Sequence, residues 1–275
     1  MTTYAVGTGI RQPAVAGAFY PAQQERLLQM LVSFLEAASP PRLQEVRALI
    51  SPHAGYIYSG PIAAYGYRLL MMQETRPRRI YLLGPAHRVW VRGVAAGTYA
   101  AFRTPLGDVP VDVVHLDRIL SAATLIHALP VAHRDEHCLE VQLPFLQVVY
   151  DGDVPPIVPL LFGDVDPRAV ARELAPFIGP DDLIIVSSDL SHYYPYERAR
   201  ALDTAFLQAL LDGDVAGVAR GEACGQLPIL TLMTLAEARG WQPHLLDYRN
   251  SGDTAGDHRQ VVGYASVAYT AGGER

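Results

Sequence analysis

Residues 45–60 read EVRALISPHAGYIYSG, an apolar run of strand length that leads into a turn containing glycine. Short apolar runs bounded by turn signals are typical of strands that are buried on both faces. We predict a buried strand over Glu45–Ser51. A helix is predicted over Pro61–Gln73, because proline is favoured in the first turn of a helix. This order of strand, turn and helix is the repeating unit of α/β domains.

The same alternation continues to the end of the chain. Further strands are predicted over Arg79–Gly84, Pro156–Phe162, Asp182–Ser188, His244–Arg249 and Val261–Tyr269, with a β-hairpin excursion within Val94–Val114. Helices are predicted over Leu116–Ala128, Cys138–Tyr150, Arg168–Ile178, Glu197–Leu211 and Leu227–Arg239, and loops over Gly7–Tyr20 and Ser251–His258. Strands alternating with helices favour a parallel sheet covered on both faces. We therefore expect a single α/β domain over residues 1–275 with a mostly parallel central sheet.

The composition limits both the chemistry and the partners. All 22 basic residues are arginine, which excludes a Schiff-base lysine and a P-loop lysine. A net charge of -6 without a basic stripe indicates no nucleic-acid partner. No apolar run reaches the roughly 18 residues that cross a bilayer, and Met1–Phe19 lacks the pattern of a signal peptide. Two cysteines exclude a disulfide-rich secreted domain, so we expect a cytoplasmic protein without a membrane partner.

Polar residues gather directly after the predicted strands. They occur in SPHAGY at 51–56, GPAHR at 84–88 and SSDLSHY at 187–193. The ligand crevice of an open α/β sheet lies beyond the carboxyl ends of its strands, so His53, His87, Asp189 and His192 should share one edge. Neutral imidazole is the commonest metal ligand, and three histidines at one edge favour a metal site. A structural hydrogen-bonding role is the alternative for each histidine taken singly.

Two other segments carry reactive residue types. The run RDEHCLE at 134–140 opens a predicted helix, where the helix dipole explains acidic residues but not His137 and Glu140. Cys224 lies just before another predicted helix, where a thiol has a lowered pKa and is a good ligand or nucleophile. An inert buried cysteine is the alternative for Cys224. Cys138, inside an amphipathic helix, is expected in the core.

Taken together, these motifs resemble the Memo family, whose bacterial and archaeal members are often called AmmeMemoRadiSam system protein B. The matching pieces follow the family order over nearly the whole chain: RQPAVAGAFYP at 11–21, SPHAGYIYSG at 51–60, LGPAHR at 83–88, DEHCLEVQLPFL at 135–146, SSDLSHY at 187–193, CGQLP at 224–228, YRNSGD at 248–253 and VVGYAS at 261–266. The resemblance implies a fold similar to that of class III extradiol dioxygenases, which are non-haem Fe(II) enzymes.

The resemblance also implies a set of site residues. His53, His87 and Cys224 match the metal ligands of the family, and His192 matches the acid/base position of the dioxygenases. Asp189 lines the same cleft, and Tyr58 is similar to a cleft tyrosine. Phe19 stands where some animal members have a tryptophan, which weakens the transfer of their phosphotyrosine-peptide binding to this chain.

The leading hypothesis is a non-haem iron protein with oxidoreductase or dioxygenase-like chemistry. Fe(II) is the expected metal, and copper is the alternative because a thiolate is a softer ligand than a carboxylate. The candidate catalytic residues are His192, Asp189, Glu136 and His137, and the candidate substrate-binding residues are Tyr56, Tyr58, Tyr193 and Arg88.

Two further hypotheses stay open. The cleft could bind a peptide or small molecule without catalysis, in a protein that acts with a radical-SAM enzyme and an AMMECR-like partner. A metal-dependent hydrolase is the third hypothesis, because a metal-bound water beside a histidine is common hydrolytic machinery.

Overall fold

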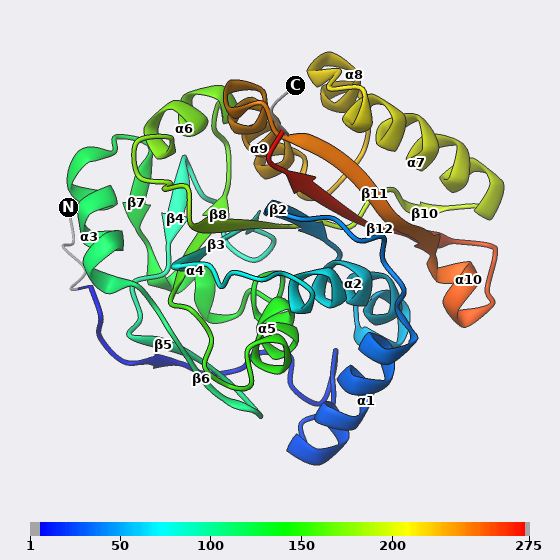
Figure 1. Ribbon diagram of the computed structural model, residues 1–275, viewed down its shortest axis with the longest axis horizontal. Coiled ribbons are helices and arrows are strands. Elements are labelled where there is room, and N and C mark those ends of the chain that lie inside the picture. The colour runs from blue at the N-terminus through cyan, green and yellow to red at the C-terminus, as the bar shows by residue number, and fades with distance from the viewer. Residues whose placement is uncertain (1–5, 273–275) are drawn as a thin grey trace.

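Four parallel strands form the centre of the main sheet, in the order β2 (Val46–Ser51), β9 (Asp182–Ser187), β3 (Arg79–Pro85) and β8 (Ile157–Phe162). They are seen in a computed structural model that describes residues 6–272. Every residue of β3, β8 and β9 is buried, as their continuous apolar sequences predict. The predicted α/β fold with a parallel centre is therefore confirmed (Figure 1).

Antiparallel pairings appear on both flanks of these four strands. On one side β12 (Val261–Thr270) pairs with β2, and both β10 (His192–Tyr194) and β11 (Gln242–Asn250) pair with β12. On the other side β4 (Val94–Ala96) pairs antiparallel with β8 and parallel with β7 (Ile126–Ala128). The predicted hairpin consists of β5 (Ala101–Thr104) and β6 (Gly107–Pro110), which form a small second sheet with β1 (Ile10–Arg11).

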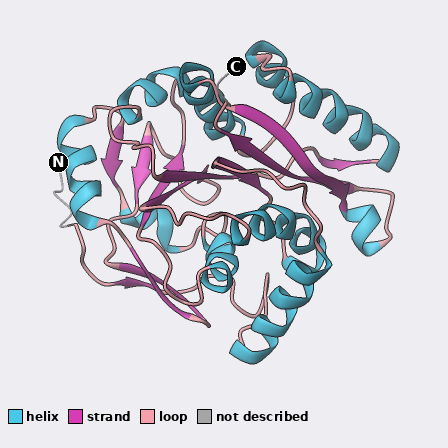
Figure 2. Cartoon of the chain, viewed as in Figure 1, coloured by secondary structure: helices cyan, strands magenta, loops and turns pink. Residues whose placement is uncertain are grey.

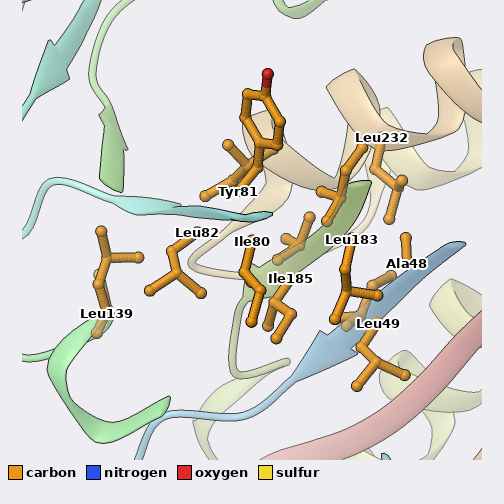
Figure 3. Close-up of a cluster of buried hydrophobic side chains, with 14 of the residues drawn as sticks. Ala48, Leu49, Ile80, Tyr81, Leu82, Leu139, Leu183, Ile185 and Leu232 are labelled. Carbon is orange, nitrogen blue, oxygen red and sulfur yellow. The ribbon is translucent and has the colours of Figure 1, made fainter. Parts of the chain in front are cut away.

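Helices cover both faces of the main sheet (Figures 1 and 2). One face carries α1 (Gln24–Ala37), α2 (Tyr56–Met71) and α5 (Leu143–Val149), and the other carries α6 (Pro167–Leu174), α7 (Tyr196–Leu211), α8 (Val215–Arg220) and α9 (Gln226–Arg239). Of three further helices, α3 (Val113–Ala122) and α10 (Ser251–Ala255) lie toward the edges, and α4 (Pro130–Arg134) contacts β4. In Figure 3, Tyr81 of β3 points to the side of Leu232 of α9, whereas Leu82 points to the side of Leu139. Among the described residues, no helix has the length and apolarity needed to cross a membrane.

The helix predicted over Cys138–Tyr150 was wrong in its first half. That segment contains only the 3-10 turn η1 (Glu140–Gln142) followed by α5, which begins at Leu143. Pro144 gives the physical reason, because proline fits the first turn of a helix but would clash with the carbonyl of Glu140 further inside one. The helix predicted over Leu116–Ala128 likewise ends at Ala122, and its last residues form β7.

Other differences concern where elements begin. Helix α2 starts at Tyr56, five residues before the predicted start, with Pro61 inside it. The predicted loop Ser251–His258 begins with α10, whose first backbone N–H groups are capped by the Asn250 side chain. Helix α1 was not predicted, although Leu27, Leu31 and Leu35 recur at helical spacing and are buried.

Candidate metal centre

His53 follows β2 and is fixed from both its backbone and its ring. Its backbone N–H donates to Asp189 Oδ1 at 2.7 Å, and its ring Nδ1 lies 2.9 Å from Ser187 Oγ. The Ser187 hydroxyl donates its only proton to the Cys138 carbonyl at 2.6 Å and accepts from the Gln142 amide at 2.8 Å. Since Ser187 has no proton left for the ring, Nδ1 of His53 must be the donor. Nε2 therefore carries no proton in the neutral ring, and it faces the Cys224 thiol at 3.1 Å.

His87 follows β3 and is held by the carboxylate of Glu136. Its ring Nδ1 donates to Glu136 Oε1 at 2.9 Å, and its backbone N–H donates to Oε2 at 2.6 Å. A carboxylate that receives the Nδ1 proton of a histidine leaves Nε2 free as a metal ligand, and this outer partner fixes the ring. In the neutral form of each imidazole, Nε2 is therefore the unprotonated nitrogen.

Glu136 is well satisfied as a buried anion. Oε1 also accepts from the backbone N–H groups of His137 at 2.9 Å and Cys138 at 3.1 Å. Burial alone would raise the pKa of Glu136, but the close His137 ring and the hydrogen bonds from His87 outweigh it and hold the pKa far below its usual value. Glu136 is thus ionised, as its role beside His87 requires.

Cys224 completes a group of three possible ligands. Its Sγ lies 3.1 Å from His53 Nε2, and the ligand atoms of His53, His87 and Cys224 all lie within 4.8 Å of one another. His53 is buried, Cys224 is half-buried and His87 is exposed, so the group opens to solvent on the His87 side. Two imidazole nitrogens and one thiolate are a donor set that suits iron, copper or zinc.

The thiol of Cys224 differs from expectation in its acidity. Burial, followed by the nearby charge of Asp189, raises its pKa to about 12 instead of lowering it. Cys224 lies two residues before α9, so the favourable dipole is outweighed by the loss of water. A coordinated cation reverses this preference, since a metal-bound thiol is deprotonated.

Burial also keeps His53 in its ligand form. Its pKa is well below the usual value, first because of burial and then because of the neighbouring His137 and His87. A neutral imidazole is the form that binds a metal ion.

His137 forms the third ring of a histidine cluster. Its ring stacks on His87, with centroids 4.9 Å apart and planes 22° apart, and its centroid lies 5.4 Å from that of His53. Nδ1 is buried, lies 3.1 Å from Glu136 Oε1 and makes no aligned hydrogen bond. His87, Glu136 and His137 make a second close group. Because Glu136 already accepts several N–H groups, we interpret it as an orienting residue rather than as a ligand.

Asp189 follows β9, and His192 begins β10 three residues later. Asp189 is 4% exposed, and its backbone N–H donates to Cys224 Sγ at 3.2 Å. Its Oδ2 lies 4.0 Å from His53 Nε2, and burial raises its pKa. His192 is half-buried on β10 and belongs to neither close group of possible ligands among the described residues. This placement is compatible with an outer role in proton transfer.

The four candidate substrate-binding residues differ in exposure. Tyr58 is 38% exposed and Tyr193 is 68% exposed, and Arg88 is also exposed. Tyr56 is only 2% exposed, and its hydroxyl donates to the Val141 carbonyl at 2.6 Å. Tyr56 is therefore a packing residue, which corrects the expectation for it.

Glu140 is a further correction. The helix dipole did not explain this residue, which is of a type that can bind a metal or move protons, but its carboxylate is fully buried and paired with Arg11. Sequence reasoning also missed Gln142 and Arg11, which fix the loops of the site from the core. In the sequence, the only indication of this role was that Gln142 and Arg11 are polar residues within motifs of the family.

Fold and site together define an α/β protein with a His–His–Cys group, able to hold a metal ion, at the carboxyl ends of its strands. Residues 11–268 match the family model described as Memo-like protein, and the chain belongs to this family. MEMO1 family proteins of Aeropyrum pernix and Archaeoglobus fulgidus are both 38% identical to it, over 94% of this chain and 99% of theirs. That of Methanosarcina mazei is 36% identical over 94% of this chain and 98% of its own.

The fold is also similar to one that has been solved experimentally. The crystal structure of an uncharacterized protein of Escherichia coli K12, JW3007, superposes with a TM-score of 0.54 at 16% identity. The match covers 81% of this chain and 99% of that one. This likeness supports the α/β fold alone.

Proposed function

We propose that this chain is a metal-binding oxidoreductase with dioxygenase-like chemistry, in which His53, His87 and Cys224 hold Fe(II). One observation carries the proposal: both imidazoles are held through Nδ1, and one ligand atom from each of His53, His87 and Cys224 lies within 4.8 Å of the other two. A group in which every ligand is pre-oriented by its own partner is typical of metal sites.

The donor set also bears on which metal is bound. Three protein ligands leave coordination positions open for substrate, as catalytic sites require. Iron would supply redox and Lewis-acid chemistry when bound, and copper is the alternative because the thiolate is soft. The two cysteines are free, and a free thiol ligand persists best in a reducing compartment, so a cytoplasmic location is part of the proposal.

The residues around the group have separate roles in the proposal. Asp189 orients His53 by accepting its backbone N–H, and Glu136 orients His87. His192 and His137 are the candidates for moving protons to and from a substrate. Tyr58, Tyr193 and Arg88 are exposed and contact the substrate.

Metal content tests the proposal directly. Protein purified without oxygen should contain about one iron per chain, because three oriented ligands are present. The double variant His53→Ala/His87→Ala should lose the metal. His127→Ala is the matched control, since His127 is exposed on β7, outside the group. Iron and copper far below one per chain, unchanged in the double variant, would contradict the proposal.

A second candidate function is non-catalytic binding of a peptide, a small molecule or a partner of a radical-SAM system. It is favoured by a cavity of about 410 Å³ that Phe19, Gly55, Ile57 and Tyr58 help to line, next to the loop of His53. Wild-type protein should then retain a partner from native extract that Tyr58→Ala does not retain. Equal recovery by both proteins would count against this candidate.

A further inference from the structure

A buried ion pair joins the N-terminal segment Arg11–Tyr20 to the loop 133–140. The Arg11 guanidinium is 1% exposed, and the Glu140 carboxylate with which it pairs is 0% exposed. Taking two charges out of water is costly, and the cost is offset only where further hydrogen bonds satisfy both groups. Those further hydrogen bonds show what the pair holds together.

Arg11 ties the loop at three points. Besides Glu140, its guanidinium donates to the backbone carbonyl of His133, at 3.0 Å from Nε, and to that of Glu136. The two carbonyls and the carboxylate bracket the stretch that contains Glu136 and His137. A planar guanidinium with donors in fixed directions suits such a role better than a flexible ammonium group.

Glu140 binds the N-terminal segment. Its carboxylate accepts the backbone N–H groups of Ala14 at 2.8 Å and Val15 at 3.1 Å, and the hydroxyl of Tyr20. The N-terminal segment is thereby fastened to the loop along its length.

Both connected segments reach the metal ligands. Within the loop, Glu136 accepts the backbone and ring N–H groups of His87. Within the N-terminal segment, the Phe19 ring packs on His137 with centroids 4.9 Å apart. The Phe19 carbonyl accepts the backbone N–H of Tyr56 at 2.8 Å, three residues after His53.

We propose that Arg11 and Glu140 are positioning residues of the metal centre: together they set the loop that aims Glu136, and through it His87, at the metal. The inference rests on the proposed metal-binding function. It predicts that loss of the pair weakens metal binding beyond what a general loss of stability explains.

Co²⁺ is a suitable probe, because its absorption reports thiolate and imidazole coordination. Arg11→Met and Glu140→Gln should each weaken Co²⁺ binding about ten- to a hundredfold, the range found when outer partners of ligands are removed. Tyr20→Phe removes one donor to Glu140 but keeps the ion pair, so it should fold readily and show a smaller loss. Affinities are measured by competition with a chelator on protein shown to be folded by circular dichroism.

Arg79→Met is the matched control. Arg79 is a buried arginine paired with Asp112 and Asp182 at the start of β3, the end opposite His87. Its loss should destabilise the protein and leave Co²⁺ affinity unchanged. Unchanged affinity in Arg11→Met, or an equal loss in Arg79→Met, would overturn the inference.

Backbone hydrogen exchange gives a readout that does not need the metal. The N–H groups of His137 and Cys138 donate to Glu136 and should exchange faster in metal-free Arg11→Met and Tyr20→Phe than in Arg79→Met. Exchange no faster in these variants than in the control would also contradict the inference. If wild-type protein binds no Co²⁺ at all, the proposed metal-binding function fails instead.

Discussion

His53 and His87 are oriented by acceptors of different chemistry, a serine hydroxyl and a carboxylate. The difference matters at the residue scale, because a carboxylate adds negative charge next to the ring and a hydroxyl does not. His87 should therefore depend on its partner more strongly than His53. Glu136 is the residue through which this can be measured.

Replacing Glu136 with Gln should weaken metal binding about ten- to a hundredfold, because the amide carries no charge and opposes one N–H of His87 with its own NH₂ group. Metal affinity measured by chelator competition checks this. Glu173→Gln is the control, since Glu173 also accepts backbone N–H groups, from Thr124 and Leu125, but outside the site. Equal affinity of the Glu136 variant and wild type would show that Glu136 does not orient the ligand.

The sequence predicted which residues belong to the candidate site better than it predicted their acidity and burial. His53, His87 and Cys224 do come together, because two of them follow central strands and the third precedes a helix on that side. The acidity of Cys224 and the burial of Tyr56 depend on neighbours distant in sequence, which spacing does not reveal. Loss of contact with water explains both the raised pKa of Cys224 and the packing role of Tyr56.

At the scale of elements, apolar runs located the central strands because strands buried on both faces have nearly continuous apolar sequences. The segment 133–142 was harder, since its backbone is fixed by side chains from elsewhere, such as Arg11 and Ser187, rather than by its own periodicity. It supplies Glu136 and His137. The least regular part of the predicted site was thus also the least predictable.

The junction between β9 and α9 offers a test at this scale. A Cβ atom on Gly225 would lie 2.6 Å from Ser188 Cβ and 2.8 Å from the Ser187 carbonyl oxygen. Gly225→Ala should therefore push the Cys224 turn away from β9, with a cost of about 1–3 kcal/mol and weaker metal binding. Unfolding by urea and chelator competition measure the two effects.

Gly179→Ala is the control for this substitution. The added Cβ would meet the Asp182 carboxyl group at ordinary distances, 3.5 Å to Oδ2 and 3.8 Å to Cγ. Stability and metal affinity should stay close to wild type in this variant. Normal metal affinity in Gly225→Ala would show that the turn of Cys224 can shift without disturbing the site.

At the scale of the whole molecule, buried histidines make stability depend on pH. His133 is 1% exposed and lies 2.9 Å from the Ala95 carbonyl oxygen, and burial lowers its pKa to about 4. The unfolded chain binds this proton near pH 6.5, so the stabilising contribution is complete above that pH and is lost as the pH falls toward 4. Between about pH 7 and pH 5 the loss amounts to about 2 kcal/mol.

His133→Gln keeps a donor for Ala95 but cannot titrate. The free energy of unfolding, measured by urea at both pH values, should therefore fall by about 2 kcal/mol less in this variant than in wild type. Other titrating groups act equally in both proteins, and the comparison removes them. Parallel losses in the two proteins would show that His133 does not titrate in this range.

The metal group joins segments from across the chain, since His53 follows β2, His87 follows β3 and Cys224 precedes α9. A ligand that binds only the folded state stabilises it by about 2.7 kcal/mol at a concentration one hundred times its Kd. For a chain of this length, the midpoint of thermal unfolding should rise by about 5 °C. Cys224→Ser should abolish most of this rise, because a hydroxyl is a poor ligand for soft metals.

Cys138→Ser is the control, at a fully buried cysteine outside the group. Its midpoint without metal should be lower than that of wild type, and its rise on metal binding should be unchanged. A rise of equal size in Cys224→Ser would mean that the metal binds without the thiol, and the three segments would then be joined by the histidines alone.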